Sequence, residues 1–332
     1  QVKPKRVETQ RIGRGITSTL FLSGTPLINR PVELWTTVNT LAPHVPQFSE
    51  FLRFAFRYCD ATRERFGWNF NGNSNLPELH ELLNRHVMLR RVKADVLQEL
   101  PPKIYTTLPL EWDRGEYDKL ARAFEGRGDW RQGVEALVQW GGNPPKSTLP
   151  IVEMQKLREM AAYSKIASAV EWIQDFCEGG DKLVVFAHHR NMIDQVRQQL
   201  EQHEDYRGGV QVIQGGISTQ DRDAAVQRFQ NDPTVRVILV SITAGGFGLT
   251  LTAASAVAFL QLPWTMGDVS QAADRVHRIG QTADSVRVFN LVAADSIEED
   301  IAALIMGKAE IMDNVLDGGR AVNAVDLTVK GK

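Results

Sequence analysis

The chain has 332 residues, of which 43% are apolar and 23% charged, the composition of an ordinary globular protein with room for two domains. No run of 18 or more apolar residues occurs, which excludes an ordinary membrane-spanning helix, and the first fifteen residues lack the apolar stretch of a secretory signal peptide. The formal net charge of −2 hides an asymmetry, because residues 1–103 carry 15 Lys and Arg against 9 Asp and Glu, as expected of a protein that meets a polyanion on one part of its surface.

The first hundred residues are predicted to be mostly helical after a basic beginning. The apolar run Thr19–Leu22 has strand-like composition and stops at the turn residues Ser23, Gly24 and Thr25. A domain rarely begins with one strand after a basic tail, so we expect the sequence to be a piece of a longer domain. Apolar spacing of i, i+3 and i+4 predicts helices over Val32–Leu41, Gln47–Asp60 and Glu78–Leu97, with a turn-rich loop at Gly67–Asn75.

The second half has a clearer pattern than the irregular stretch over residues 104–150. From Ile151 onwards, short apolar runs alternate with amphipathic helices. The runs are Leu183–Ala187, Val210–Ile213, Val235–Ile242, Ala256–Leu262 and Val286–Val292, and the helices are Asn191–His203, Ser218–Gln230 and Val269–Ile279. This alternation predicts an α/β fold with a parallel sheet covered on both faces, whose ligands bind in the loops after the strands.

One of these loops is rich in glycine. Ser241 and Thr243 supply hydroxyls at the end of a predicted strand, and Gly245, Gly246 and Gly248 allow the backbone to turn sharply and approach a ligand. A plain strand-to-helix turn has the same composition, so the loop alone does not decide between the two.

The segment Gln271–Gln281 follows the next strand and carries two arginines. On a helix, Gln271, Arg275 and Arg278 form one stripe, and Asp274 is spaced to pair with Arg278. Guanidinium groups match phosphate oxygens and stay charged, so this face is a candidate for stabilising developing negative charge. A solvated helix with ordinary ion pairs is the competing interpretation.

The order of these segments resembles a known family. QAADRVHRIGQ (Gln271–Gln281) resembles motif VI of the SWI/SNF-type ATPases of helicase superfamily two, SITAGGFGLTLTAAS (Ser241–Ser255) resembles motif V, LFLSGTP (Leu20–Pro26) motif III and LVVFAHH (Leu183–His189) motif IV. The segments PVELWTTVNTLAPHVPQFSEF and RYCDATRERFGWNFNGNSNLPELHELL resemble the annealing-helicase branch, which includes SMARCA-like and HepA-related proteins.

The resemblance implies a division of the chain into RecA-like lobes. Residues 1–103 would be the end of the first lobe with a helical protrusion, 104–160 a linker or insertion, 161–305 the second lobe and 306–332 a C-terminal helix and tail. ATP with Mg²⁺ would bind between the lobes, mainly to the first. No GxxxxGK[ST] or DExH-like pattern occurs, so we expect a chain that is inactive alone and carries only the arginine side of the ATP site.

The resemblance also implies roles for individual residues. Arg275 and Arg278 would be arginine fingers, with Gln271, Asp274, Gly246 and Gly248 in nucleotide binding or coupling; Ser23, Gly24 and Thr25 would transmit between lobes; and Arg190, Gly215, Ser218, Arg222, Ser241 and Thr243 would contact DNA. The expected partners are double-stranded or forked DNA and the first lobe of the same protein, with no membrane.

Two other functions remain open at this point. The chain could be a non-catalytic DNA- or partner-binding module with a RecA-like fold, or part of a nucleosome or transcription-complex remodeller. Two cysteines, Cys59 and Cys177, are too few for a disulfide framework or zinc cluster, which favours buried thiols in a reducing compartment. That compartment would be the cytoplasm of a bacterium or virus-infected cell, or the nucleus of a eukaryote.

Overall fold

The computed structural model describes residues 19–23, 26, 27, 30–64, 67–91, 93–97, 99–124, 133–135, 138, 151–242 and 248–316. Among these, residues 19–96 and 306–316 form one compact unit, called unit 1, and residues 97–305 form a second, called unit 2. The long helix α13 (Ile297–Leu316) begins in unit 2 and ends in unit 1.

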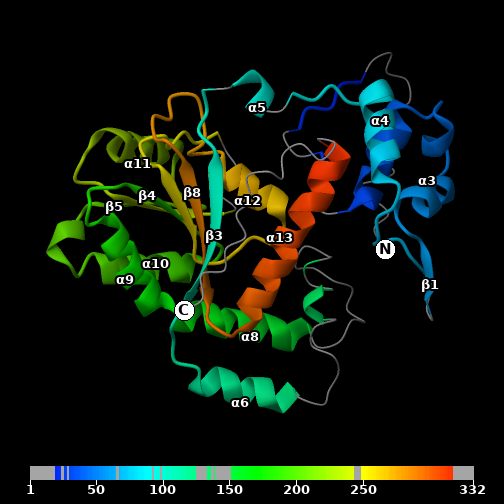
Figure 1. Cartoon of the computed structure of the whole chain (residues 1–332). Helices are drawn as coiled ribbons and strands as arrows, with labels where there is room; N and C mark the ends of the chain where they lie inside the picture. The colour runs from blue at the N-terminus through cyan, green and yellow to red at the C-terminus, as the bar shows by residue number, and fades with distance from the viewer. Residues whose placement is uncertain are drawn as a thin grey trace. The chain divides into compact units, whose positions relative to one another are not determined.

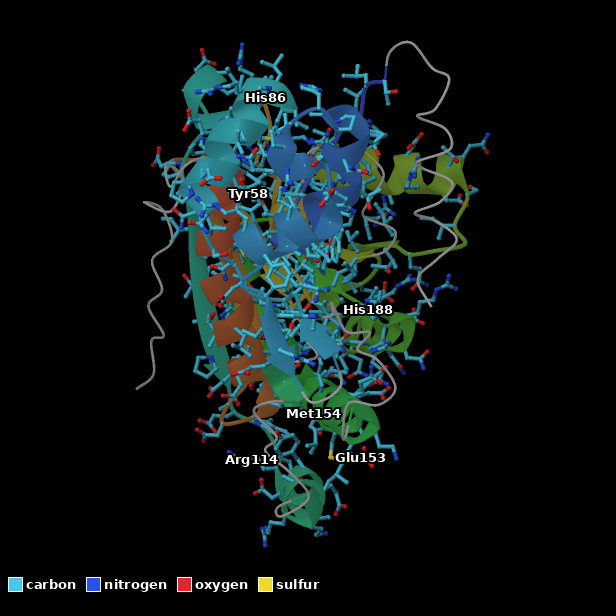
Figure 2. All side chains as sticks on the ribbon, turned by 90° about the vertical axis from the view of Figure 1, so that its right-hand side faces the viewer. Tyr58, His86, Arg114, Glu153, Met154 and His188 are labelled. Atoms are coloured by element: carbon cyan, nitrogen blue, oxygen red, sulfur yellow. The ribbon has the colours of Figure 1, made fainter. Side chains whose placement is uncertain are left out.

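Unit 1 is built from short helices and one small hairpin. Its elements are η1 (Pro31–Leu34), α2 (Trp35–Leu41), η2 (Pro46–Phe48), α3 (Phe51–Tyr58), β1 (Thr62–Glu64), β2 (Gly67–Asn69), α4 (Leu76–His86) and α5 (Lys93–Val96). Apolar side chains of α2, α3, α4 and the end of α13 fill its core. In this core the buried Tyr58, labelled in Figure 2, donates a 2.8 Å hydrogen bond from its hydroxyl to Glu78 Oε1.

Two predictions for unit 1 were wrong. The helix expected over Glu78–Leu97 is two helices, because α4 ends at His86, where the backbone of the C-cap residue Val87 leaves the helical conformation, and α5 begins at Lys93. Residues Thr19–Leu22 form no strand in the described part of the chain, and Leu20 and Leu22 are 80% and 86% exposed. Strand propensity measures fit to a half-buried sheet surface, and these exposed side chains have no such surface to pack on.

Unit 2 is an α/β layer structure, as predicted. Its elements are β3 (Lys103–Leu110), α6 (Gly115–Phe124), α8 (Ile151–Ser164), α9 (Ile166–Cys177), β4 (Leu183–Ala187), α10 (Arg190–Leu200), η3 (Glu204–Tyr206), β5 (Val210–Ile213), α11 (Thr219–Asn231), β6 (Val237–Ser241), β7 (Ala256–Phe259), α12 (Met266–Ala273), β8 (Val286–Ala293) and the start of α13. The six larger strands form one sheet in the order β3-β8-β7-β4-β6-β5, and every neighbouring pair is parallel. This is the α/β arrangement of a RecA-like lobe that the family resemblance implied.

The sheet is covered on both faces. Every residue of β4, β6 and β7 is buried, which explains why these strands read as unbroken apolar runs. Alternate residues such as Leu183 and Val185 pack with α9 and α10, which lie along one side of the sheet in Figure 1. On the other face, Phe186 stacks against Phe259 at a ring distance of 5.5 Å.

One strand lies where we expected an irregular connection. Residues Lys103–Leu110 form β3, which pairs in parallel with the whole of β8, from Lys103 opposite Val286 to Leu110 opposite Ala293. The run KIYTTLPL is only partly buried, because β3 is an edge strand with one sheet neighbour. Its mixed composition therefore lacks the apolar signal that identified the central strands.

Candidate functional site

The predicted functional residues of unit 2 gather at one edge of the sheet. The register pairs Ala187 of β4 with Ser241 of β6, and Phe186 with Phe259 of β7, so these strands end side by side. Because the strands are parallel, the loops that follow them leave from the same edge. This edge carries the end of β6 at Ser241, the start of α10 and the segment that leads into α12.

The arginine segment is a series of tight turns rather than a helix. The predicted helix over Val269–Ile279 ends early, since α12 stops at Ala273. Beyond it, Arg275 N–H bonds to the Ala272 carbonyl at 3.1 Å, a three-residue spacing, and the Arg275 carbonyl accepts a 2.8 Å bond from Leu251 N–H. The tertiary contact with Leu251 thus takes the carbonyl that a continuing helix would have used.

Arg278 is held by the segment that follows the glycine loop. Its Nη1 donates to Thr250 Oγ1 at 3.0 Å and reaches the Gly248 carbonyl at 3.5 Å. Its Nε donates to the backbone carbonyl of Asp274 at 3.1 Å. The guanidinium group is therefore fixed in orientation while the residue remains only partly buried.

The predicted ion pair between Asp274 and Arg278 was wrong. The Asp274 carboxylate instead lies 3.1 Å from Lys103 Nζ, at the start of β3, and 3.8 Å from His277 Nδ1. The physical reason is the early end of α12, because the i,i+4 side-chain geometry exists only on a continuing helix. Burial lowers the pKa of Lys103, but the nearby Tyr105 and Asp274 groups outweigh burial, so its pKa is raised overall and it stays cationic.

Arg275 lies beside Arg278 in this segment. It is only 9% exposed. Burial lowers the pKa of Arg275, the like charge of Arg278 lowers it further, and the Asp274 carboxylate opposes both. Because the ordinary pKa of an arginine guanidinium lies far above neutral pH, both groups remain cationic. An anion placed between them would relieve their repulsion.

The segment that follows the glycine loop is joined to the arginine segment by further hydrogen bonds. Gln281 Nε2 donates to the carbonyls of Ala254 at 2.7 Å and Thr252 at 3.4 Å. Gly248 is exposed and adopts a φ of +53°, which glycine tolerates without strain. Of the other predicted residues here, Gln271 is exposed on the last turn of α12, while Gly246 and Thr243 lie outside the described residues.

A second group of predicted residues lies at the starts of α10 and α11. Arg190 is the first residue of α10, and its guanidinium lies directly over Gly215: a Cβ atom at Gly215 would be 2.6 Å from Arg190 Nη2. Ser218 caps α11, accepting a 3.1 Å bond from Asp221 N–H and donating a 2.8 Å bond to Asp221 Oδ2. Its hydroxyl is thus engaged in the helix cap.

Arg222 and Ser241 differ in exposure. Arg222 is partly buried on the first turn of α11, with its Nε 3.9 Å from Asp223 Oδ1. Ser241 is only 2% exposed at the end of β6. A hydroxyl inside the sheet does not contact DNA directly, so the described conformation gives Ser241 a place in the core of the lobe. In unit 1, Ser23 is exposed, while Gly24 and Thr25 lie outside the described residues.

Sequence reasoning missed a buried glutamine at the same edge. Gln261 is 2% exposed, and its Oε1 accepts bonds from the backbone N–H groups of His188 at 3.2 Å and His189 at 3.4 Å. His188 is labelled in Figure 2, and burial lowers its pKa, as do the charges of His189 and Arg158. The available signal was that Gln261 is the one polar residue within the apolar run predicted over Ala256–Leu262.

A buried ionic cluster was also missed. Lys165 Nζ pairs with Glu298 Oε2 and donates to the Leu291 carbonyl at 2.6 Å, and both side chains are almost fully buried. Close by, Arg158 donates to the Leu262 carbonyl and lies 3.7 Å over the Trp264 ring, while burial lowers its pKa to about 10. These contacts hold the segment that leads into α12.

The described residues have neither a metal-ligand cluster nor a helix that could span a membrane. They contain no group of three or more His, Cys, Asp or Glu side chains placed to hold a metal ion. No helix among them combines the length and apolar composition that crossing a bilayer requires.

Comparison with known proteins places these segments in a family. The profile described as "SNF2-related domain" matches residues 14–127, and "Helicase conserved C-terminal domain" matches residues 165–280. The chain is 34% identical to the DNA annealing helicase and endonuclease ZRANB3 of Mus musculus, over 90% of this chain and 27% of that protein. It is 36% identical to the SWI/SNF-related matrix-associated actin-dependent regulator of chromatin subfamily A-like protein 1 of Bos taurus, over 88% of this chain and 29% of that protein.

The chain therefore spans less than a third of the length of these relatives. Among solved structures, it is similar to the Sulfolobus solfataricus SWI2/SNF2 ATPase core in complex with dsDNA, with 22% identity, a TM-score of 0.49 and coverage of 87% of this chain and 60% of that one. The two profiles together with the curated relatives identify the family: the chain belongs to the SWI/SNF-type ATPases of helicase superfamily two, in the annealing-helicase branch.

Proposed function

We propose that the chain supplies the arginine fingers and part of the DNA track of a DNA-dependent ATPase, a double-stranded DNA translocase that remodels or anneals DNA. The observation that carries this proposal is the pair Arg275 and Arg278, because the Arg275 backbone and the Arg278 guanidinium both bond to the segment after the glycine loop. Membership of the SWI/SNF-type family supports the choice of ATP and DNA as substrate and partner.

The arginines act on the phosphate that is being transferred. In the transition state of phosphoryl transfer, negative charge spreads over the equatorial oxygens, and an arginine finger accelerates related reactions by about 10³–10⁵. That factor corresponds to roughly 4–7 kcal/mol of transition-state stabilisation. Because Arg278 is already oriented by Thr250, Gly248 and Asp274, little side-chain freedom remains to be lost when the phosphate arrives.

ATP is the substrate of this reaction, and Gln271, exposed beside the arginines, is proposed to couple its binding to DNA. The Mg²⁺ that accompanies ATP needs oxygen ligands of its own. Among the described residues no cluster of ligands fits it, so no step is assigned to a metal held by this chain. The motif III residues Ser23, Gly24 and Thr25 are proposed to transmit between lobes.

The DNA contact is proposed to involve the starts of α10 and α11. Arg190 and Arg222 present guanidinium groups there, and Gly215 leaves the space that the Arg190 side chain occupies. Contacts of this kind to phosphates are independent of sequence and weaken as salt increases. Hydrogen bonds from Leu251 to Arg275 and from Gln281 to Ala254 connect the loop that follows β6 with the arginine segment, which supports coupling of DNA binding to hydrolysis.

The test is ATP hydrolysis by the full-length protein with and without duplex DNA. The proposal expects hydrolysis that rises strongly with DNA of any sequence and falls as the salt concentration increases. DNA binding without hydrolysis would instead support a non-catalytic module. Strand annealing and nucleosome sliding, measured on the same preparation, separate the annealing function from chromatin remodelling.

A further inference from the structure

The carboxamide of Gln261 lies between the start of α10, which carries Arg190, and the segment that leads into α12. It is almost fully buried at the end of β7, and its Oε1 accepts bonds from two consecutive backbone N–H groups, those of His188 and His189. These two residues form the short connection between β4 and α10. One side chain therefore joins the loop after β4 to the loop after β7.

The start of α10 has no side-chain cap on its own helix. His189 is the N-cap residue of α10, and its side chain makes no capping hydrogen bond. A helix start without such a cap normally leaves backbone N–H groups to find other partners. Gln261 takes two N–H groups immediately before the helix and so fixes the direction in which α10 begins.

That direction sets the position of Arg190. Arg190 is the first residue of α10, and its guanidinium lies over Gly215, where even a Cβ atom would approach within 2.6 Å. A small rotation of the α10 start would move the guanidinium off this glycine. Gln261 is thus placed to control the DNA-facing arginine without touching DNA itself.

The other side of Gln261 leads directly to the arginine segment. The next residue, Leu262, offers its carbonyl to Arg158, whose guanidinium lies over the Trp264 ring. Thr265 then caps α12, accepting a 3.1 Å bond from Asp268 N–H. The backbone from Gln261 to α12 is therefore held at successive residues by contacts of its own, and it leads on to the segment that carries Arg275 and Arg278.

We propose that Gln261 is a positioning residue that orients Arg190 for DNA and couples that contact to the arginine segment. This inference rests on the proposed function for its identification of DNA as the ligand. A double-mutant cycle that combines substitutions of Gln261 and Arg190 measures the interaction between these two residues directly.

The experiment uses the full-length protein and four variants: Gln261→Leu, Gln261→Glu, Arg190→Ala and the Gln261→Leu/Arg190→Ala double variant. Leucine keeps the approximate size but removes the acceptor oxygen that takes both bonds, whereas glutamate keeps an acceptor oxygen at that position. Duplex DNA binding is measured by fluorescence anisotropy, alongside ATP hydrolysis with and without DNA. Thermal unfolding shows that each variant is folded at the assay temperature.

We expect Gln261→Leu to weaken DNA binding roughly three- to tenfold, the effect of losing about one or two modest hydrogen bonds. The DNA concentration for half-maximal ATPase should rise by the same factor, with basal hydrolysis unchanged within about twofold. Gln261→Glu, which retains an acceptor oxygen for the two N–H groups, should lose less DNA binding than Gln261→Leu. In the Arg190→Ala background, Gln261→Leu should produce no further loss of DNA binding.

Three results would overturn the inference: fully additive losses in the double variant, no rescue by glutamate, or a proportional loss of DNA binding and basal hydrolysis. The binding measurement does not depend on ATP hydrolysis. Absence of hydrolysis in the wild-type protein therefore contradicts the proposed function, while the link between Gln261 and Arg190 is still decided by the cycle.

Discussion

The buried pair Lys165–Glu298 gives a quantitative test of what holds unit 2 together. Glu298 Oε2 accepts from both Lys165 Nζ and the Ala293 N–H, and the two side chains are 1% and 6% exposed. Burial lowers the pKa of Lys165, whereas the charge of Glu298 raises it. The substitution Glu298→Ala leaves an ammonium group inside the lobe with the Leu291 carbonyl as its remaining described acceptor.

The expected loss of folding stability in Glu298→Ala is large. Removing one partner of a buried ion pair costs about 3–5 kcal/mol, because the other charge stays desolvated. For a unit of this size, each kcal/mol shifts the midpoint by about 2–4 °C, so the unfolding temperature should fall by roughly 6–20 °C. Replacing both residues, as in Lys165→Met/Glu298→Leu, should recover most of the loss, since the apolar pair needs no charge compensation.

Thermal and urea unfolding followed by circular dichroism measure this effect. The matched control is the exposed pair Lys119–Glu116, whose side chains are 71% and 76% exposed and whose nitrogen and oxygen lie 2.6 Å apart. Glu116→Ala should lower the unfolding temperature far less than Glu298→Ala, because water screens the exposed pair. A loss from Glu298→Ala no larger than that of the control would refute the assignment of Lys165–Glu298 as a buried structural pair.

Three further predictions concern individual groups. Gly215→Ala should weaken duplex DNA binding about as much as Arg190→Ala, because the new Cβ atom displaces the Arg190 guanidinium. The unfolding temperature should change little, since the end of a flexible side chain can move. Unchanged DNA binding measured by anisotropy would contradict the role of Arg190 over Gly215. Thr250→Val should lower DNA-stimulated kcat by about three- to tenfold, because the 3.0 Å bond to Arg278 is lost. The control Thr252→Val, which removes a hydroxyl bonded to Gln230, should leave kcat unchanged. Equal effects of the two substitutions would contradict the role of Thr250 in orienting Arg278. Burial raises the pKa of the Cys59 and Cys177 thiols to about 12, so both stay protonated at pH 8. Both should therefore react with a disulfide reagent only after unfolding. Rapid modification of the native protein would contradict this prediction.

Much of unit 2 could be predicted because its central strands are buried on both faces. Such strands need continuous apolar residues, and the run Leu183–Ala187 coincides with β4, which lies between β7 and β6. The edge strand β3 could not be predicted in the same way, because partial burial permits threonine and proline within it. The propensity of a short segment does not reveal whether it will find a sheet neighbour.

The candidate site shows a similar division. The residues of the arginine segment were predicted from their family pattern, and the strand order brings this segment to the loop after β6. Its backbone was not predicted, since α12 ends through a bond from Leu251, a residue remote in sequence. The partner of Asp274 is Lys103, which is 171 positions away, and no local spacing rule connects residues so distant.

The most direct measurement of arginine-finger action compares turnover with nucleotide affinity in the full-length Arg278→Ala variant. We predict that DNA-stimulated kcat falls by about 10³-fold or more, while ATP binding and the unfolding temperature change little, because the guanidinium acts mainly in the transition state. Arg278→Lys should recover only a small part of the rate, since an ammonium group lacks the planar fork. Turnover of Arg278→Ala within about threefold of wild type would contradict the assignment of Arg278 as a finger.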